Sequence, residues 1–338
     1  MRRADPPGGV GRARDVLVPE VPTLRWDGRQ AVGGKGPRDL CPRGGPTGVV
    51  LPRWSDAAGR ATDFGWTTAF DCPRTSRRAR ARARAPVCIM HRFQISPALA
   101  KDELVVLPED ESRHAATVLR LEPGDRVELL DGAGGRMEAT VETVGRREVV
   151  VRVGRRHPAV ARRPEVWLLA ALLKGKAWDA TVQKATELGA AVIAPMQCER
   201  CVVRVDPAEG DAKVEAWRRT AIEAAKQCGT PWLPRVLRPA PVAAVLSALG
   251  KPDAAFVAAL SGETRPIRGW APDIRSGLGR EPATIAVAIG PEGDFVPAEL
   301  EALGAAGFRA ITLGPLVLRA DTAAIASLAV VQHEFGAS

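Results

Sequence analysis

The chain has 338 residues, 46% of them hydrophobic, which is enough for two domains with a sizeable core. No apolar run reaches the roughly 18 residues that a membrane span requires, and no secretory signal pattern opens the chain. Its six cysteines are too few and too scattered for a disulfide framework. The composition therefore predicts a reduced, cytoplasmic protein that is not bound to a membrane.

The net charge of +9 comes entirely from one end of the chain. Residues 1–89 carry 17 Lys and Arg against 8 Asp and Glu, whereas residues 90–338 carry 31 of each. The global basicity is therefore no evidence that the remainder of the chain binds nucleic acid.

Residues 1–89 contain 22 Gly or Pro, show no helical or strand periodicity, and end in an arginine-alanine run over 77–84. One interpretation is a basic arm that touches RNA phosphates. The other is a disordered or mis-annotated extension, such as an arginine-, glycine- and proline-rich upstream region would encode if the start codon were misassigned, with Met90 as the natural start. We expect the second.

Short alternating segments follow, and they predict a small β-barrel over residues 90–160. The expected strands cover residues 104–107, 125–130, 137–141 and 148–153, with one short helix over 112–121. Residues 155–164, with two prolines and four arginines, are expected to form a linker.

From residue 165 onward strands alternate with helices, which predicts a parallel α/β sheet covered on both faces. The expected strands cover residues 166–173, 191–196, 254–260, 284–289 and 310–313. The expected helices cover residues 177–188, 212–228, 297–303 and 322–335, and Asp321 is a suitable N-cap for the last of them.

Two glycine loops near the C-terminus are candidates for a binding site. Residues 290–293 (Gly-Pro-Glu-Gly) follow a buried strand and precede a helix, and residues 313–323 repeat this arrangement. Glycine lets backbone approach a ligand closely, and parallel sheets bind ligands at the carboxyl ends of their strands. Taken singly, each loop is better explained as an ordinary turn between a strand and a helix.

Several sequence blocks occur in a fixed order along the chain. They cover residues 91–93, 114–120, 124–125, 174–176, 183–189, 199–201, 224–229, 290–293 and 313–323, together with Pro195. Together these blocks resemble the ribosomal RNA small subunit methyltransferase E family. This family belongs to the SPOUT (trefoil-knot) superfamily and methylates N3 of a uridine in small-subunit rRNA.

The resemblance implies a fold and an assembly. Residues 90–160 would be a PUA-like RNA-binding barrel, and residues 165–338 a methyltransferase domain whose C-terminal segment threads through a loop, contrary to the rule that chains do not knot. The protein would act as a homodimer on small-subunit (16S) ribosomal RNA within the assembled small subunit, with its active site at the subunit interface.

The resemblance also implies the site residues. S-adenosyl-L-methionine would lie in the knot, bound by Leu260, Ser261, Gly262, Ile289, Gly290, Pro291, Glu292, Gly293, Leu313, Gly314, Leu316, Val317 and Leu318. Contacts with RNA would come from Arg92, His114, Arg120, Lys174 and Lys176.

Methylation at N3 requires the loss of a weakly acidic proton, so the enzyme must stabilise a developing uridinate. Arg319, in the loop beside the cofactor, is our candidate for this role; it could instead contact a phosphate or pair with Asp321. The base would be Asp321 or solvent.

Four positions depart from the family pattern. Asp294 occupies a position where the family usually has a second glycine, and Val296 a position where it has a serine or threonine helix cap. Leu316 replaces the usual arginine, and Asp321 replaces the usual glutamate. The loss at Leu316 could remove a positive contact to RNA.

Other functions remain open at this point. Cys198 and Cys201 form a CxxC, but no second CxxC or paired histidines follow, so we expect no metal. The alternative functions are a SPOUT methyltransferase that acts on another RNA such as tRNA, and a non-catalytic RNA-binding ribosome assembly protein.

Overall fold

The computed structural model describes residues 91–158, 161, 163–260 and 262–336. The expectations for residues 1–89 and for Ser261 concern positions outside these ranges.

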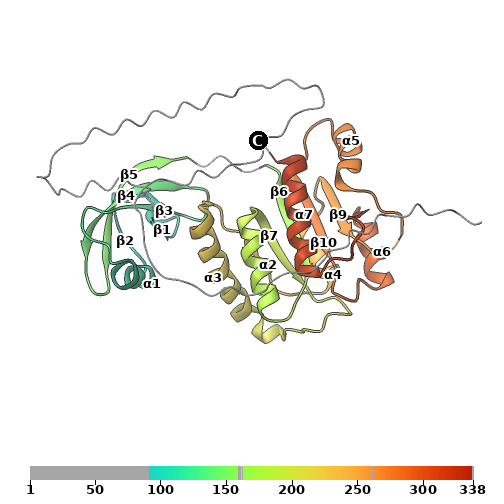
Figure 1. The fold of residues 1–338 in the computed structure, drawn as a ribbon, viewed down its shortest axis with the longest axis horizontal. Helices are drawn as coiled ribbons and strands as arrows, with labels where there is room; N and C mark the ends of the chain where they lie inside the picture. Colours follow the sequence, from blue (N-terminus) through green and yellow to red (C-terminus); the bar gives the residue numbers. More distant parts are fainter. Residues whose placement is uncertain (1–90, 159–160, 162, 261, 337–338) are drawn as a thin grey trace, which may run out of the picture. The chain divides into compact units, whose positions relative to one another are not determined.

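The N-terminal part of the described chain forms a five-stranded sheet in the order β1-β3-β4-β5-β2 (Figure 1). Its strands are β1 (His91–Gln94), β2 (Leu104–Val106), β3 (Arg126–Leu130), β4 (Arg136–Val144) and β5 (Val149–His157). The β1–β3 pair is parallel and the other pairs are antiparallel. Within the described residues the end strands β1 and β2 do not pair, so backbone hydrogen bonds do not close the expected barrel.

A helical segment packs on this sheet. A single turn, η1 (Leu99–Lys101), precedes β2, and helix α1 (Glu109–Arg113) continues directly into a π-helix, η2 (His114–Leu119). The expected helix over 112–121 therefore begins three residues too late. Arg120 ends it in the left-handed region, at φ 52°. Ala115 and Leu121 are buried with Phe93 and Val105, so the segment completes the barrel core.

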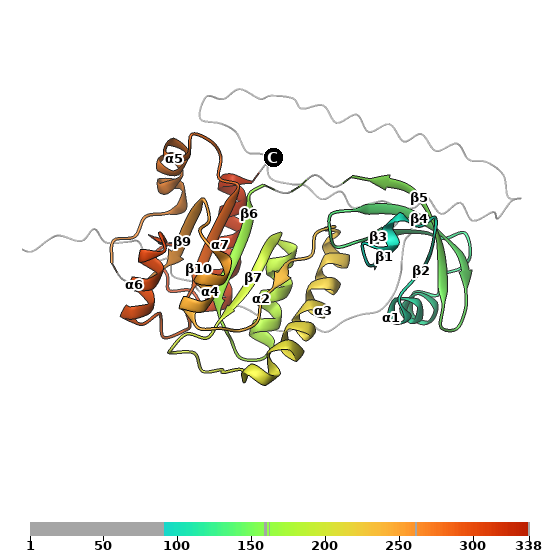
Figure 2. The same ribbon diagram turned by 180° about the vertical axis from the view of Figure 1, so that it is seen from behind.

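The second sheet has six parallel strands in the order β11-β9-β10-β6-β7-β8 (Figure 2). The strands are β6 (Glu165–Ala171), β7 (Ala190–Met196), β8 (Arg235–Val236), β9 (Ala254–Ala258), β10 (Thr284–Ile289) and β11 (Arg309–Ile311). The predicted parallel sheet is confirmed. The strand expected over 166–173 ends at Ala171, and residues 172–173 continue as buried loop.

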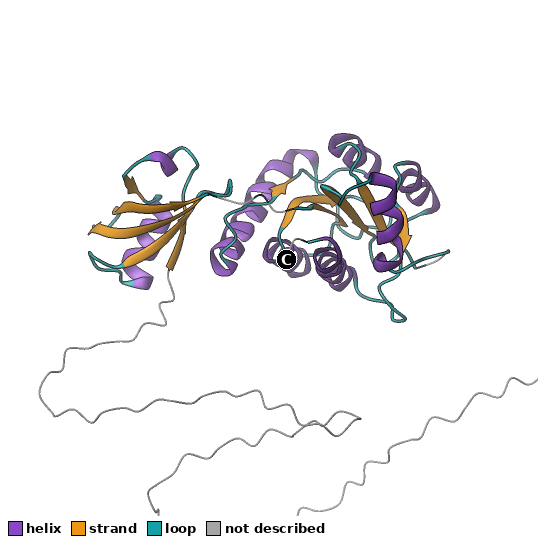
Figure 3. Ribbon diagram, turned by 90° about the horizontal axis from the view of Figure 1, so that it is seen from above, coloured by secondary structure: helices purple, strands orange, loops and turns teal. Residues whose placement is uncertain are grey.

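Helices cover both faces of this sheet, as predicted (Figure 3). One face packs against helices α2 (Lys176–Glu187), α3 (Gly210–Cys228), α5 (Ile267–Leu278) and α7 (Ala320–Phe335). The opposite face packs against α4 (Val242–Leu249) and α6 (Pro297–Ala305). Strand β6 serves both faces, because Leu168 points into one cluster and Leu169 into the other. The turn η3 (Pro207–Glu209) leads into α3.

The last helix begins earlier than the sequence indicates. Helix α7 starts at Ala320, and Arg319 occupies the N-cap position with extended backbone angles. Asp321 therefore lies in the first turn, and its prediction as N-cap was wrong. Its carboxylate still accepts a hydrogen bond locally, from the N–H of Thr322 at 2.8 Å.

Candidate functional site

A pocket lies where three loops meet at one edge of the parallel sheet. The loops follow β9, β10 and β11, which end at the same edge because they run parallel. The lining comes from residues 258–260, 289–292, 311–314 and 316–318, with Asp294 and two alanines of α7. This is the edge at which α/β sheets bind ligands, so the two glycine loops and the loop after β9 do form one site.

Most residues that the resemblance assigned to the cofactor line this pocket. They are Leu260, Ile289, Gly290, Pro291, Glu292, Leu313, Gly314, Leu316, Val317 and Leu318. Gly262 and Gly293 do not line it. The sequence reasoning missed Ala258, Ala259, Asp294, Ile311, Thr312, Ala320 and Ala323. Small residues at the ends of buried strands were the available signal for the alanines.

The pocket combines exposed apolar side chains with backbone polar groups. Leu260, Leu316 and Val317 are 61%, 76% and 78% exposed, although large apolar side chains usually gain by burial. The N–H of Gly314 donates to the Thr312 hydroxyl at 3.2 Å, which fixes the loop after β11. A nucleoside would fit such a lining, because the edges of its flat base can form hydrogen bonds with backbone groups while the faces of the base contact apolar side chains.

Gly290 is turned against the protein interior. A Cβ built on it would lie 3.0 Å from the ring of Phe295, a buried core residue. The glycine is therefore needed for close packing of the loop as well as for access to a ligand. A Gly290→Val substitution is therefore expected to disturb the packing around Phe295 as well as the pocket.

Gly293 has a different reason to be glycine. The Arg200 side chain crosses it so closely that a Cβ would lie 3.3 Å from Cδ, and Arg200 Nη1 donates to the Gly293 carbonyl oxygen at 2.7 Å. The neighbouring Glu199 N–H donates to the Glu299 carboxylate at 2.8 Å. The loop after β7 therefore braces the 290–293 loop from outside the pocket.

Two departures from the family pattern find local explanations. Asp294 adopts φ 61°, a conformation natural to glycine that aspartate tolerates better than most residues, and its carboxylate accepts a hydrogen bond from the Phe295 N–H at 2.8 Å. At Val296, the N-cap of α6, the side chain cannot cap the helix. The Glu299 carboxylate instead accepts from the Val296 N–H at 3.1 Å.

Arg319 and Asp321 are neighbours in sequence of residues that line the pocket, but neither of them lines it. Arg319 lies between Leu318 and Ala320, which both line it, and its side chain is exposed. Within the described residues no ion pair joins Arg319 to Asp321, so that alternative receives no support. The guanidinium is therefore available to a ligand, whether substrate base or phosphate.

The candidate RNA contacts divide into two kinds. Lys174 and Lys176 are exposed at the carboxyl end of β6, on the same edge as the pocket, and His114 and Arg120 are exposed on the barrel. Arg92 differs, because it is half-buried and bonded within the chain. Its Nε donates to the Glu128 carboxylate at 2.7 Å, and its Nη1 to the carbonyl oxygens of residues 226 and 227 at 3.1 Å each.

The two cysteines of the CxxC are both buried, and the Cys201 thiol donates to the Met196 carbonyl oxygen at 3.6 Å. No group of three or more potential metal ligands occurs among the residues that the structure describes. In the same part of the chain, no helix is both long and apolar enough to cross a membrane.

Two family models match the chain. An RNA methyltransferase domain matches residues 161–332, and an RNA methyltransferase PUA domain matches residues 107–154. The first coincides with the parallel sheet and its helices, and the second falls within the five-stranded sheet. The PUA-like prediction for the N-terminal sheet is thereby confirmed.

Curated relatives and solved structures agree with these models. The ribosomal RNA small subunit methyltransferase E of Mycobacterium bovis is 34% identical over 232 residues, 68% of this chain and 86% of the relative. The ribosomal RNA small subunit methyltransferase E of Synechocystis is 30% identical over 243 residues, which cover 71% of this chain and 77% of the relative.

Two solved structures extend the match to the fold. A putative methyltransferase from Legionella pneumophila, solved with bound SAM, has a TM-score of 0.66 at 28% identity, over 74% of this chain and 99% of its own. A ribosomal RNA small subunit methyltransferase E from Neisseria gonorrhoeae, also bound to S-adenosyl methionine, has a TM-score of 0.63 at 27% identity, over 73% and 98%. The chain belongs to the ribosomal RNA small subunit methyltransferase E family.

Proposed function

We propose that this protein transfers the methyl group of S-adenosyl-L-methionine to N3 of a uridine in small-subunit ribosomal RNA. The observation that carries the proposal is the pocket formed by the loops after β9, β10 and β11, in a chain whose structural relatives were solved with this cofactor bound. The N3 position rests on the family resemblance.

In this proposal the pocket holds the cofactor, which supplies an electrophilic methyl group. Backbone groups of residues 258–260, 290–292 and 313–318 bind the adenosine part. Leu260, Leu316 and Val317, exposed without a ligand, cover its faces and exclude water. Holding N3 in line with the methyl group then supplies much of the rate enhancement.

Arg319 is the residue that we assign to stabilise the uridinate. Its place in the chain between Leu318 and Ala320, which both line the pocket, supports this assignment, because its exposed positive charge lies on the same loop. The proton leaves to Asp321 or to water. One oxygen of Asp321 already accepts from Thr322, which leaves the other free to accept.

The finer parts of the proposal follow the family. They are a trefoil knot around the cofactor pocket, a homodimer with the active site at the interface, a cytoplasmic location and action on the small subunit. The domain boundaries 90–160 and 165–338 and the extension over 1–89 are proposed with them. The homodimer rests on the family resemblance.

The test is methylation of small ribosomal subunits that lack the modification, with radiolabelled S-adenosyl-L-methionine and mass spectrometry of the digested nucleosides. We expect label in 3-methyluridine and none in tRNA offered alongside. Label in tRNA alone would support a different RNA substrate. Absence of cofactor binding in a calorimetric titration would support a non-catalytic assembly protein.

A further inference from the structure

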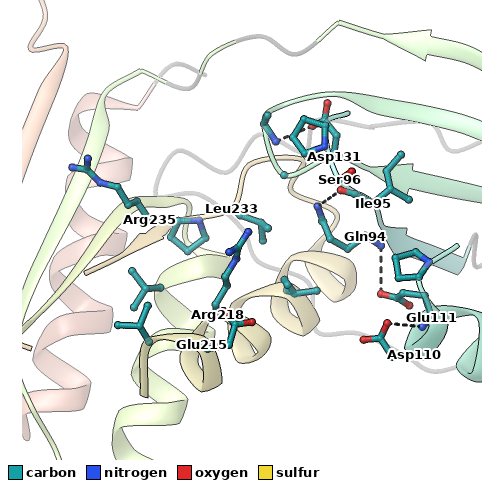
Figure 4. Close-up of a pocket in the computed structure, with 18 residues that line it drawn as sticks. Gln94, Ile95, Ser96, Asp110, Glu111, Asp131, Glu215, Arg218, Leu233 and Arg235 are labelled. Atoms are coloured by element: carbon teal, nitrogen blue, oxygen red, sulfur yellow. Dashed lines mark hydrogen bonds between the residues drawn. The ribbon is translucent and has the colours of Figure 1, made fainter. Parts of the chain in front are cut away.

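A second cavity, of about 630 Å³, lies between the five-stranded sheet and helix α3 (Figure 4). Residues 94–97, 108, 110–111 and 131–133 contribute its first wall, and α3 with residues 233–236 its second. It shares no residue with the pocket at the strand ends. Its volume is within the range of small-molecule sites in proteins.

Backbone hydrogen bonds join the two walls. The Gly134 N–H donates to the Pro231 carbonyl oxygen at 2.9 Å, and the Leu233 N–H donates to the Gly132 carbonyl oxygen at 3.0 Å. Between them, Ala133 and Trp232 form an antiparallel bridge. The turn between β3 and β4 is therefore tied to the segment before β8, and the cavity has a built rim.

Helix α3 presents one stripe of side chains to this cavity. Val214, Arg218 and Ile222 are spaced four residues apart along this stripe, and Trp217 and Ala221 on the adjacent stripe are buried in the core. Arg218 is exposed, Ile222 is half-buried, and Val214 is half-buried against that core. Figure 4 shows Arg218 projecting from α3 into the space near Leu233. Apolar side chains thus form a platform beside a positive charge.

The polar groups of the cavity are mostly acceptors. The Gln94 Oε1 is buried without a hydrogen-bond partner in the described residues, while its Nε2 donates to the Ile95 carbonyl oxygen. The carboxylates of Asp110 and Glu215 also line the cavity. A ligand bound mainly through phosphate would be repelled here, whereas a ligand with N–H donors would be attracted.

We propose that this cavity binds an unpaired nucleobase of the RNA substrate, one that carries an exocyclic amine. The base lies on the platform of Val214, Ile222 and Leu233 and donates its amine to Gln94 Oε1, and Arg218 contacts the sugar–phosphate backbone. Proteins commonly recognise single-stranded RNA by binding bases splayed out of the stack in this way. The inference rests on the proposed function, since it supplies a second contact to the same RNA.

The test is fluorescence anisotropy with short labelled oligonucleotides of A, C or U, at fixed salt. We expect the full chain to bind A and C about tenfold more tightly than U, because uracil carries a carbonyl oxygen where adenine and cytosine carry the amine, and two acceptor oxygens would then face each other at Gln94 Oε1. Ile222→Trp, which fills the cavity, should abolish this preference, and so should Gln94→Leu. Arg218→Ala should weaken binding of all three oligonucleotides. Arg219→Ala is the matched control, because it removes an exposed arginine from the next position of α3, outside this cavity, and should change binding less than about twofold.

Equal binding of A, C and U, or an Ile222→Trp variant that keeps the preference, would overturn the proposal and point to another occupant of the cavity, such as a protein. Calorimetry with S-adenosyl-L-methionine on each variant reports whether the cofactor pocket is intact. The binding assay needs no methyl transfer. A wild type that selects bases through this cavity but leaves small subunits unmethylated therefore contradicts the proposed reaction alone.

Discussion

The ammonium group of Lys226, near the end of α3, lies 2.9 Å from the carboxylate of Glu111 in α1. Their side chains are only 12% and 7% exposed. Arg92 reinforces this contact by donating to the carbonyl oxygens of Lys226 and Gln227, which the end of a helix leaves without partners. The N-terminal sheet thus holds α3 through a buried ion pair and a side-chain cap.

Replacing Lys226 with methionine should destabilise the protein strongly, because Glu111 would be left buried without its partner. The expected loss in the free energy of unfolding is about 3 kcal/mol, measured by urea denaturation. Lys184→Met is the control. It breaks a more exposed pair, Lys184–Glu187 at 2.9 Å, and should cost less than about 1 kcal/mol. Similar losses in the free energy of unfolding of the two variants would show that the buried ion pair stabilises the protein no more than the exposed one.

The same variant should depend on pH in a defined direction. Burial raises the pKa of the Glu111 carboxyl above 4.5, although Lys226 acts to lower it. The folded protein therefore loses stability as pH rises through this raised pKa, because the buried carboxyl becomes ionised. Loss of Lys226 raises that pKa further. The loss in the free energy of unfolding caused by Lys226→Met should therefore be largest at neutral pH. It should shrink below pH 4.5, where Glu111 is protonated in the wild type and in the variant. A deficit constant between pH 4 and 7 would contradict this account.

Asp253 predicts the opposite pH dependence. Hydrogen bonds from Arg280, and from the N–H groups of Ala283 and Thr284, lower the pKa of its carboxyl below 3.8. Its contribution is therefore present above pH 3.8 and is lost as pH falls through the lowered pKa. Asp253→Asn should cost about 1–3 kcal/mol at pH 7 and progressively less below pH 3.8. The measurement is the urea midpoint of both proteins at neutral and acid pH; parallel pH curves would rule the effect out.

Arg200→Ala should weaken cofactor binding without touching the pocket, because it releases the Gly293 carbonyl oxygen from its brace. We expect the KM for S-adenosyl-L-methionine to rise about tenfold, with a smaller change in kcat and partial recovery in Arg200→Lys. Arg204→Ala is the control, since Arg204 bonds to the Glu199 carbonyl oxygen within its own loop and not to Gly293. If both alanine variants change KM equally, the brace is not specific to Arg200.

Leu316→Arg introduces the arginine that is usual in the family. Leu316 is 76% exposed at the pocket, so the free energy of unfolding should not change measurably. If this loop meets RNA phosphate, one added contact should steepen the log–log salt dependence of binding by about 0.7–0.9. An unchanged slope would place the loop away from the RNA backbone. Leu316→Gln controls for loss of the leucine without adding charge.

Local patterns in the sequence were sufficient for the class of fold and for two of the three loops that line the pocket at the strand ends. Strands buried on both faces have continuous apolar sequences. The 290–293 loop can be recognised from its glycines and from its place directly after such a strand. The ends of parallel strands must meet at one edge, so the two glycine loops could be assigned to one site, whereas the loop after β9 was assigned by family resemblance.

Tertiary contacts decided what local patterns could not. Helix α7 begins at Ala320 because that residue packs in the core, although Asp321 is the better cap by residue type. Arg92 resembles an RNA contact in sequence, yet the end of α3 and Glu128, residues distant in the chain, engage its guanidinium. Gly293 is glycine because Arg200 crosses it. In each case the deciding partner is brought close only by folding, so no local pattern could specify it.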